Sequence, residues 1–185
     1  MRKIGLFGGA FNPIHIGHIK MAEAAQREYK LSHVYFIPCG IPPHKPKKEI
    51  LPAQARCELV KKAIRGNKSF SVLDIEIKKK KKTYTLNTVK EIRETMLSAS
   101  GTHSGASLIY FLIGQDEFEK LHTWYKANEL AKLVKFLVFP RVRDGASKAE
   151  KIKPPSVENL NWSLVHAKPV NISSTEIRNK IKKMN

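Results

Sequence analysis

The sequence predicts an α/β protein built on a Rossmann-like, doubly wound parallel sheet, and three observations predict it. Short apolar runs alternate along the chain with segments in which apolar residues have helical spacing. Two runs, residues 108–113 and 136–139, are continuously apolar, which is typical of strands buried on both faces. The first run, residues 3–7, ends in glycines that lead into a helix. Strands that alternate with helices in this way form a parallel sheet covered on both faces.

The first half of the chain supplies two strands and two helices. The first strand covers residues 3–7, and a helix begins near Gly17. A second strand at residues 34–37 leads into a loop at 38–52 that is rich in proline and charge. Helical spacing predicts a helix over residues 53–64. The apolar positions of that helix are Ala55, Leu59, Val60, Ala63 and Ile64.

The second half continues the alternation. Residues 70–77 alternate as a strand does, and a helix follows. Residues 98–107 are small and polar, with two glycines, which predicts a surface connection. The strands at 108–113 and 136–139 come next. The apolar positions of the helix after residue 77 are Leu86, Val89, Ile92, Met96 and Leu97.

Length and composition set the limits of the function. A chain of 185 residues suits a single domain, residues 1–185, with a full core. It contains no stretch of eighteen apolar residues and no signal-peptide pattern, so a soluble, cytoplasmic protein without a membrane partner is expected. Cys39 and Cys57 lack metal-ligand spacing and are expected to be free thiols.

The net charge of +18, from 34 basic and 16 acidic residues, raises the question of a nucleic-acid partner. The lysines are dispersed, and the one dense run, residues 78–82, has no interleaved aromatic side chains that could stack on bases. We interpret that run as a solvated loop between a strand and a helix. No specific nucleic-acid partner is expected, and the overall positive charge would help to gather anionic substrates.

Residues 8–18 read GGAFNPIHIGH and carry the clearest chemical signal in the chain. A strand that ends in glycines and opens a helix places backbone N–H groups at a positive helix end, which suits phosphate. His15 and His18, three residues apart, can each donate a hydrogen bond to a phosphate oxygen. Each residue alone could serve a turn or a helix cap. Together they indicate phosphoryl or nucleotidyl transfer.

The same string resembles the first motif of the bacterial nucleotidyltransferases, which makes the expected fold one of nucleotidyltransferase type. The resemblance implies that residues 15–18 bind the α- and β-phosphates of ATP. It also implies a wider set of ATP-binding residues. In the first half of the chain these are Gly8, Gly9, Ala10, Phe11, His15, His18 and Lys45.

A second stretch, residues 172–178 (ISSTEIR), resembles the second phosphate-binding motif of that superfamily. Ser173 and Glu176 form a capping-box pattern at the head of a helix and are assigned to structure. The N–H groups of Ser174 and Thr175 would face an anion, and Arg178 would grip the β- and γ-phosphates as a fork.

Three further stretches are similar to the bacterial nicotinate mononucleotide adenylyltransferases. The 108–113 strand continues into Gly-Gln-Asp and is followed by Trp124, residues 83–88 read TYTLNT, and residues 42–45 read PPHK. Asn87 departs from the family, which usually has Asp at that position. Matching segments extend from residue 3 to residue 178.

This resemblance implies a mononucleotide site. Asp116 would accept hydrogen bonds from the ribose, and Trp124 would stack on the nicotinate ring. Tyr84 and Thr85 would orient the mononucleotide, with Thr85 a helix cap as its alternative role. Trp124 could instead fill the core. The remaining members of the site are His44 and Arg141. His44 would approach the triphosphate together with Lys45. Arg141 could equally be a rim residue.

The implied reaction is a direct displacement, in which the phosphate of nicotinate mononucleotide attacks the α-phosphorus of ATP. His15, His18 and Arg178 are the catalytic candidates. Mg²⁺ is expected to be carried by the ATP phosphates, because no carboxylate cluster suggests a metal site built by the protein. Pantetheine-phosphate adenylyltransferase, a class I aminoacyl-tRNA synthetase and a non-catalytic basic RNA-binding module are the alternatives. The oligomeric state stays open.

Overall fold

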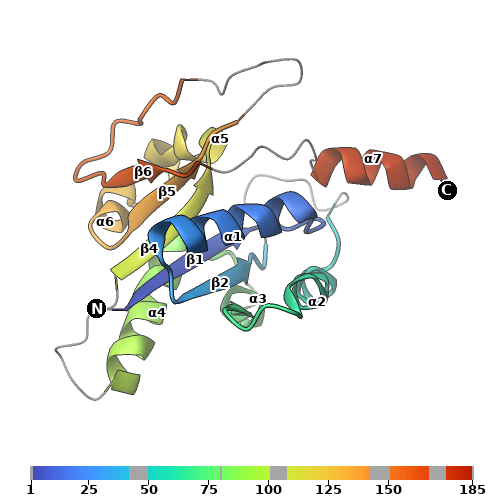
Figure 1. Ribbon diagram of the computed structural model, residues 1–185, viewed down its shortest axis with the longest axis horizontal. Coiled ribbons are helices and arrows are strands. Elements are labelled where there is room, and N and C mark those ends of the chain that lie inside the picture. Colours follow the sequence, from blue (N-terminus) through green and yellow to red (C-terminus); the bar gives the residue numbers. More distant parts are fainter. Residues whose placement is uncertain are drawn as a thin grey trace.

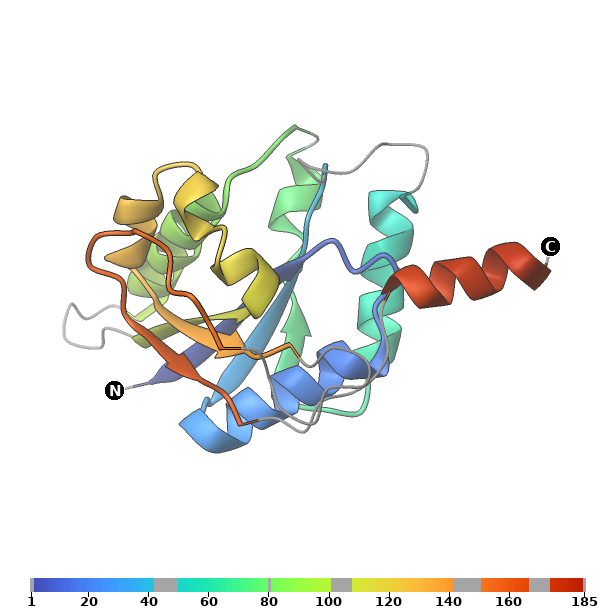
Figure 2. The ribbon, with the colours of Figure 1, turned by 90° about the horizontal axis from the view of Figure 1, so that it is seen from above.

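A computed structural model describes residues 2–41, 50–79, 81–100, 108–141, 151–166 and 174–184 (Figure 1). Its strands form one six-stranded sheet in the order β3-β2-β1-β4-β5-β6, and every neighbouring pair is parallel. Helices cover both faces of the sheet, as Figure 2 shows from above. The predicted doubly wound α/β fold is therefore confirmed.

The bounds of the long helices and strands agree closely with the apolar pattern of the sequence. The strands are β1 (Lys3–Gly9), β2 (His33–Pro38), β3 (Phe70–Val72), β4 (Leu108–Gly114), β5 (Lys135–Phe139) and β6 (Trp162–Leu164). The longer helices are α1 (Ile16–Tyr29), α2 (Ala53–Ile64), α4 (Thr85–Ser100) and α7 (Ser174–Met184). The short helices are α3 (Ile75–Lys78), α5 (Gln115–Phe118), η2 (Leu121–Thr123) and α6 (Ala127–Ala131).

Alternate residues of the strands enter two separate hydrophobic clusters, one on each face of the sheet. In β4, Phe111 packs in the cluster under α4, α5 and α6, whereas Leu112 packs in the cluster under α1 and α2. In β5, Phe136 and Leu137 divide in the same way. Strands buried on both faces have no polar side to mark them, which is why they are continuously apolar in the sequence.

The strand order reverses direction at β1. From β1 the chain moves to β2 and β3 on one side, and it then returns to place β4 on the other side of β1. In open parallel sheets, ligands bind at such a switch point, beyond the carboxyl ends of the strands. Gly9 ends β1 and Gly114 ends β4 at this edge, so the fold brings the predicted glycine loop and the segment that contains Asp116 to one side of the molecule.

Two predicted boundaries are wrong. The strand expected at 70–77 pairs only over Phe70–Val72, and the chain then turns into α3, where the Asp74 carbonyl accepts hydrogen bonds from the next turn. Leu73 and Ile75 pack against the core from that turn, so their apolar character does not require an extended strand. The connection expected at 98–107 begins later, because α4 continues to Ser100; residues 101–107 lie outside the described residues.

The buried face of α2 also differs from the expected stripe. Val60 and Ile64 are buried as predicted, but Ala55 and Ala63 are exposed and Arg56 and Cys57 take the buried positions. The elements α5, η2, α6 and β6 were not predicted, because three to five residues are too few to establish a period.

The lysine run was expected in a solvated loop but begins inside α3. Lys78 pairs with Asp74 at 2.9 Å, and Lys79 pairs with Glu91 of α4. Cys39 and Cys57 are free thiols, as expected. No helix among the described residues is long and apolar enough to cross a bilayer.

The close approach of the β2–α2 connection to α3 makes a stability prediction. A Cβ atom at Gly40 would lie 2.5 Å from the Glu76 carbonyl oxygen, whereas one at Gly66 would meet nothing within 4 Å. We expect Gly40→Ala to lower the free energy of unfolding by about 1–3 kcal/mol and Gly66→Ala to change it by less than about 1 kcal/mol. Urea unfolding measures both; equal effects would contradict the contact.

Candidate active site

The first phosphate motif begins where β1 ends. β1 extends through both glycines, with Gly8 opposite Ile37 and Gly9 opposite Pro38 in the sheet. A Cβ atom at Gly9 would lie 3.2 Å from the Phe11 ring, so this glycine lets the loop fold back on the strand. Phe11 has φ of +43°, a conformation that L residues rarely adopt, and its side chain is buried. The loop is therefore held tightly between the strand and α1.

His15 and His18 lie together at the start of α1. His15 is the N-cap, and the centroids of the two imidazole rings are 3.7 Å apart, with an angle of 35° between the ring planes. The backbone N–H of His15 donates to Nδ1 of His18 at 3.2 Å. A neutral His18 that accepts at Nδ1 carries its proton on Nε2. The spacing in the sequence thus brings both rings to one place.

His15 has a distinct electrostatic environment. Burial lowers its pKa, and the neighbouring Glu176 carboxylate opposes that effect only in part. Its Nδ1 atom is buried and has no hydrogen-bond partner among the described residues. A nitrogen without an acceptor nearby favours the neutral tautomer that carries the proton on Nε2. In these tautomers each ring has an Nε2–H group that can donate a hydrogen bond to a phosphate oxygen.

The second motif docks onto the first, although 161 residues separate the joined positions Pro13 and Ser174. The Ser174 hydroxyl donates to the Pro13 carbonyl at 3.0 Å, and Nη1 of Arg178 donates to the Asn12 carbonyl at 2.7 Å. Nη2 of Arg178 donates to the Thr175 hydroxyl at 3.1 Å. The structure thus brings the N-terminal turns of α1 and α7 together, as a shared phosphate site requires.

Two candidates of the mononucleotide side meet at the ends of β4 and β5. Asp116, in α5, forms an ion pair with Arg141, and both side chains are more than half exposed. The backbone N–H of Arg141 donates to the buried Gln115 side chain at 2.9 Å. Arg141 is therefore a direct neighbour of the candidate ribose ligand, and its exposure also fits the alternative role of a rim residue.

Tyr84 lies near Trp124, because it stacks on Tyr125, the next residue in the chain. Tyr84 precedes α4 and stacks on Tyr125, with ring centroids 4.5 Å apart, while Trp124 packs edge-on against Phe111 at 6.0 Å. Trp124 is only partly buried, so the core interpretation accounts for one edge of the ring and leaves the rest accessible. It lines an open depression together with His122, Lys126, Ala127, Asn128, Glu129 and Ser156.

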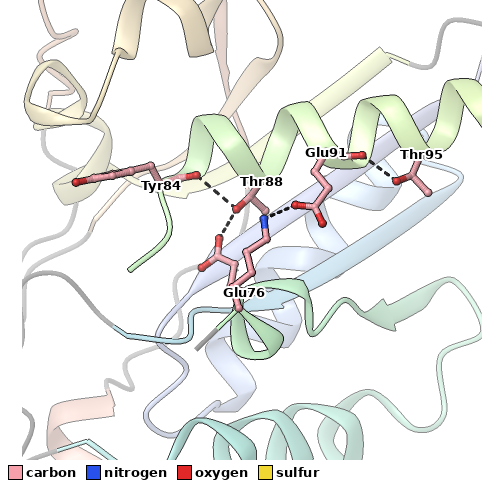
Figure 3. A network of polar contacts seen from close by, with 6 residues as sticks. Glu76, Tyr84, Thr88, Glu91 and Thr95 are labelled. Carbon is pink, nitrogen blue, oxygen red and sulfur yellow. Dashed lines mark hydrogen bonds and ion pairs between the residues drawn. The ribbon is translucent and has the colours of Figure 1, made fainter. Parts of the chain in front are cut away.

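A buried polar network holds the start of α4 in place (Figure 3). Thr85 is the first residue of α4, and the backbone N–H groups of Asn87 and Thr88 donate to the Tyr84 carbonyl. The Thr88 hydroxyl donates to Glu76 of α3 at 2.8 Å. Burial raises the pKa of Glu76, against the effect of its hydrogen bonds with Thr88 and Thr83. The position of Tyr84 and Thr85 therefore depends on a partly buried carboxyl group.

Two predicted site residues, His44 and Lys45, lie outside the described residues, as does the capping residue Ser173. The other candidates fall into two groups along the carboxyl edge of the sheet. The phosphate group contains Gly8, Gly9, Ala10, Phe11, His15, His18, Ser174, Thr175 and Arg178. The mononucleotide group contains Tyr84, Thr85, Asp116, Trp124 and Arg141. Within the described ranges, no group of three or more His, Cys, Asp and Glu side chains is placed to hold a metal ion.

Sequence reasoning missed three buried polar residues that shape the site. Arg56 donates to the Ala10 carbonyl, Asn12 accepts from the Leu51 N–H at 3.0 Å, and Gln115 joins Arg141 to Glu119. A signal existed for Arg56, because it precedes Val60 by four residues and so lies on the apolar face of α2. Asn12 and Gln115 gave no comparable periodic signal.

Fold and site together define an α/β protein of nucleotidyltransferase type, with its glycine loop at the end of the central strand. The sequence profile of the cytidylyltransferase-like family matches residues 6–180. The chain belongs to this family and, within it, to the nicotinate-nucleotide adenylyltransferases.

Two curated relatives, each named probable nicotinate-nucleotide adenylyltransferase, cover nearly the whole chain. The protein from Desulfitobacterium hafniense is 36% identical over 98% of this chain and 84% of its own. The one from Shouchella clausii is 38% identical over 99% of this chain and 86% of its own. A solved structure of the Plasmodium falciparum nicotinic acid mononucleotide adenylyltransferase complexed with NaAD shares the fold, with a TM-score of 0.73 and 18% identity over 99% of this chain and 90% of that one.

The raised pKa of Glu76 leads to a prediction about stability and pH. The folded protein holds the Glu76 proton more tightly than the unfolded chain does, so the stability linked to this group is lost as the pH rises through the folded-state pKa. We expect Glu76→Gln, which keeps an oxygen acceptor for Thr88, to raise the free energy of unfolding at pH 7 and to have little effect at pH 4. Urea unfolding at both pH values measures this.

The matched control is Glu23→Gln on the exposed face of α1, which removes the same charge from a highly basic protein. If Glu23→Gln raised stability at pH 7 by as much as Glu76→Gln, the gain would come from net charge and not from burial.

Proposed function

We propose that this protein transfers the adenylyl group of ATP to nicotinate mononucleotide, forming nicotinate adenine dinucleotide and pyrophosphate in NAD biosynthesis. Membership of the nicotinate-nucleotide adenylyltransferases supports this reaction. The observation that carries it on this chain is the pairing of the stacked His15 and His18 rings with the Arg178 motif around one glycine loop. The cytoplasmic localisation expected from the sequence remains a prediction.

The reaction requires alignment and charge stabilisation, with no protein nucleophile. An oxygen of the mononucleotide phosphate attacks the α-phosphorus of ATP, and the bond from that phosphorus to the bridging oxygen of the β-phosphate breaks. The attacking phosphate is anionic at neutral pH, so no general base has to activate it. The protein has to hold two anions in line and balance the negative charge that spreads over the phosphate oxygens.

On the ATP side, we assign His15 and His18 to the α- and β-phosphates, through their Nε2–H groups. The tautomer argument supports this, because it leaves both donors available on neutral rings. Arg178 holds the departing pyrophosphate; a guanidinium has five N–H donors, so its bonds to Asn12 and Thr175 are compatible with an anion contact. Ser174 and Thr175 begin α7, and their backbone N–H groups are assigned to the same anion.

Backbone amides of the loop, from Gly8 to Phe11, complete the phosphate site, and Lys45 is assigned to the triphosphate. Mg²⁺ carried by the ATP phosphates would supply charge neutralisation on the leaving group. His15 and His18 are nitrogen ligands and this hard cation prefers oxygen, so we keep the two histidines in the role of hydrogen-bond donors.

On the mononucleotide side, we assign Asp116 to the ribose and Trp124 to the nicotinate ring. The accessible part of Trp124 supports a stacking role, and its edge contact with Phe111 fixes the plane of the ring. Tyr84 and Thr85 orient the mononucleotide from the start of α4. His44 is assigned to the same side, from which it approaches the triphosphate together with Lys45. Arg141 pairs with Asp116 in the structure. A ribose bound to the Asp116 carboxylate would therefore share that carboxylate with the Arg141 guanidinium.

The acceptor is tested by measuring pyrophosphate release from Mg·ATP with nicotinate mononucleotide, nicotinamide mononucleotide and 4′-phosphopantetheine in parallel. We expect strong release with the nicotinate compound and much weaker release with the other two. Strong release with phosphopantetheine would overturn the acceptor while keeping the phosphate site. Absence of release with all three, from a folded protein, would contradict the proposed reaction.

The role of the histidines is tested with His18→Ala. Removing one donor to a developing charge typically lowers kcat by about 10²–10³-fold, and we expect a loss of that order with a much smaller change in the KM for ATP. His166→Ala is the control, because His166 is exposed and pairs with Glu28 at the other end of α1. An unchanged kcat in His18→Ala would remove His18 from the catalytic site.

A further inference from the structure

One buried cation close to the phosphate loop has no role in the proposed reaction. Arg56 lies on the inner face of α2 and is only 1% exposed. Arg56 has the largest of the fully buried side chains in the described part of the protein. Arginine stays charged in proteins, so a full positive charge lies under the surface here.

Arg56 joins three segments through their carbonyl oxygens. Nη1 donates to the Ala10 carbonyl at 2.6 Å, in the phosphate loop. Nη2 donates to the carbonyls of Cys39 and Gly40, at 2.7 and 2.9 Å, just beyond β2. Nε donates to the Leu51 carbonyl at 3.0 Å, just before α2. One side chain thus fixes the ends of β1 and β2 to the start of α2.

The bond to Ala10 sets the direction of a peptide group in the phosphate loop. In a planar trans peptide the C=O and N–H groups point in opposite directions. Because the Ala10 carbonyl points at Arg56, the N–H of Phe11 points away from it. Phe11 has a positive φ, which a bond on the preceding peptide helps to maintain.

The next carbonyls of the loop are held in the same manner. Asn12 offers its carbonyl to Arg178, and Pro13 offers its carbonyl to the Ser174 hydroxyl. Carbonyl oxygens that faced a phosphate would repel it, whereas carbonyls bonded to donors on α2 and α7 are directed away from it. Arg56 therefore fixes the carbonyl of Ala10 in the first half of the loop, as the second motif fixes the carbonyls of Asn12 and Pro13 in the other half.

The charge of Arg56 also needs an explanation. Within the described residues its partners are neutral carbonyls and the Cys39 thiol, and no ion pair includes it. Burying a cation without a countercharge costs several kcal/mol. A polyphosphate bound on the far side of the Ala10–Phe11 peptide would supply a negative charge, in a region where a low dielectric constant strengthens the attraction.

We propose that Arg56 is a positioning residue for ATP: it directs the Ala10–Phe11 peptide N–H toward the triphosphate and places a positive charge behind the loop. This inference rests on the proposed function. It does not make Arg56 a catalytic residue, because the side chain acts through the backbone that it holds.

The test compares Arg56→Lys, which keeps the charge and loses the fork, with Arg56→Met, which loses both. Arg65→Lys is the matched control, because Arg65 is exposed at the end of the same helix. Mg·ATP and nicotinate mononucleotide are titrated separately by calorimetry, and KM and kcat are measured for each. Circular dichroism and thermal melting establish that each variant is folded at the assay temperature.

We expect Arg56→Lys to weaken ATP binding by about tenfold and Arg56→Met by more, in keeping with the loss of charge-assisted hydrogen bonds. Binding of the mononucleotide and the Arg65→Lys control should change by less than about twofold. Equal losses for both substrates, or unchanged ATP binding in folded Arg56→Met, would overturn the proposal. Failure of both Arg56 variants to fold would also overturn it, because the residue would then serve stability alone.

The ATP titration separates this proposal from the proposed function. If the wild-type protein binds Mg·ATP but does not turn over nicotinate mononucleotide, the acceptor is wrong, and the Arg56 variants still report on ATP. If the wild-type protein is active and the Arg56 variants bind ATP normally, the proposed function stands and the role of Arg56 is wrong.

Discussion

The pairing of β1 with β2 on one side and β4 on the other is the constraint on which the rest of the structure depends. It buries β1 between the two hydrophobic clusters and brings the ends of three strands to one edge of the sheet. The register continues to Gly8 and Gly9, so the position of the loop that follows is fixed by main-chain hydrogen bonds. The candidate active site is an extension of this central strand.

Positive charge acts at two distances in this protein. The overall excess of basic residues gives a long-range field that draws in anions, and salt weakens it. At short range, orientation matters more than the number of charges: Arg56 and Arg178 each bond to a carbonyl of the glycine loop. A loop whose carbonyls are held in this way presents N–H groups to a ligand, which is the property that turns a glycine turn into an anion site.

The sequence was enough to predict the fold class and to single out the two segments that the structure brings together, because both leave local patterns. Continuous apolar runs identify β4 and β5, and the spacing of His15 and His18 places both rings at the first turn of α1. The boundary at residue 72 was not predictable from alternation, since Leu73 and Ile75 reach the core from a helical turn as well as from a strand. Arg56 was missed because its partners are carbonyls, which every residue carries, from segments far apart in the sequence.

The contacts of Ser174 and Arg178 with residues 12 and 13 have a consequence for the order of assembly. They join positions 161 and 166 residues apart, whereas the last strand, β6, ends at Leu164. The sheet and both hydrophobic clusters, as described, can therefore form without a contact from α7. Contacts so distant in the sequence form late. If the second motif binds ATP as proposed, folding of the sheet would thus precede completion of the ATP site.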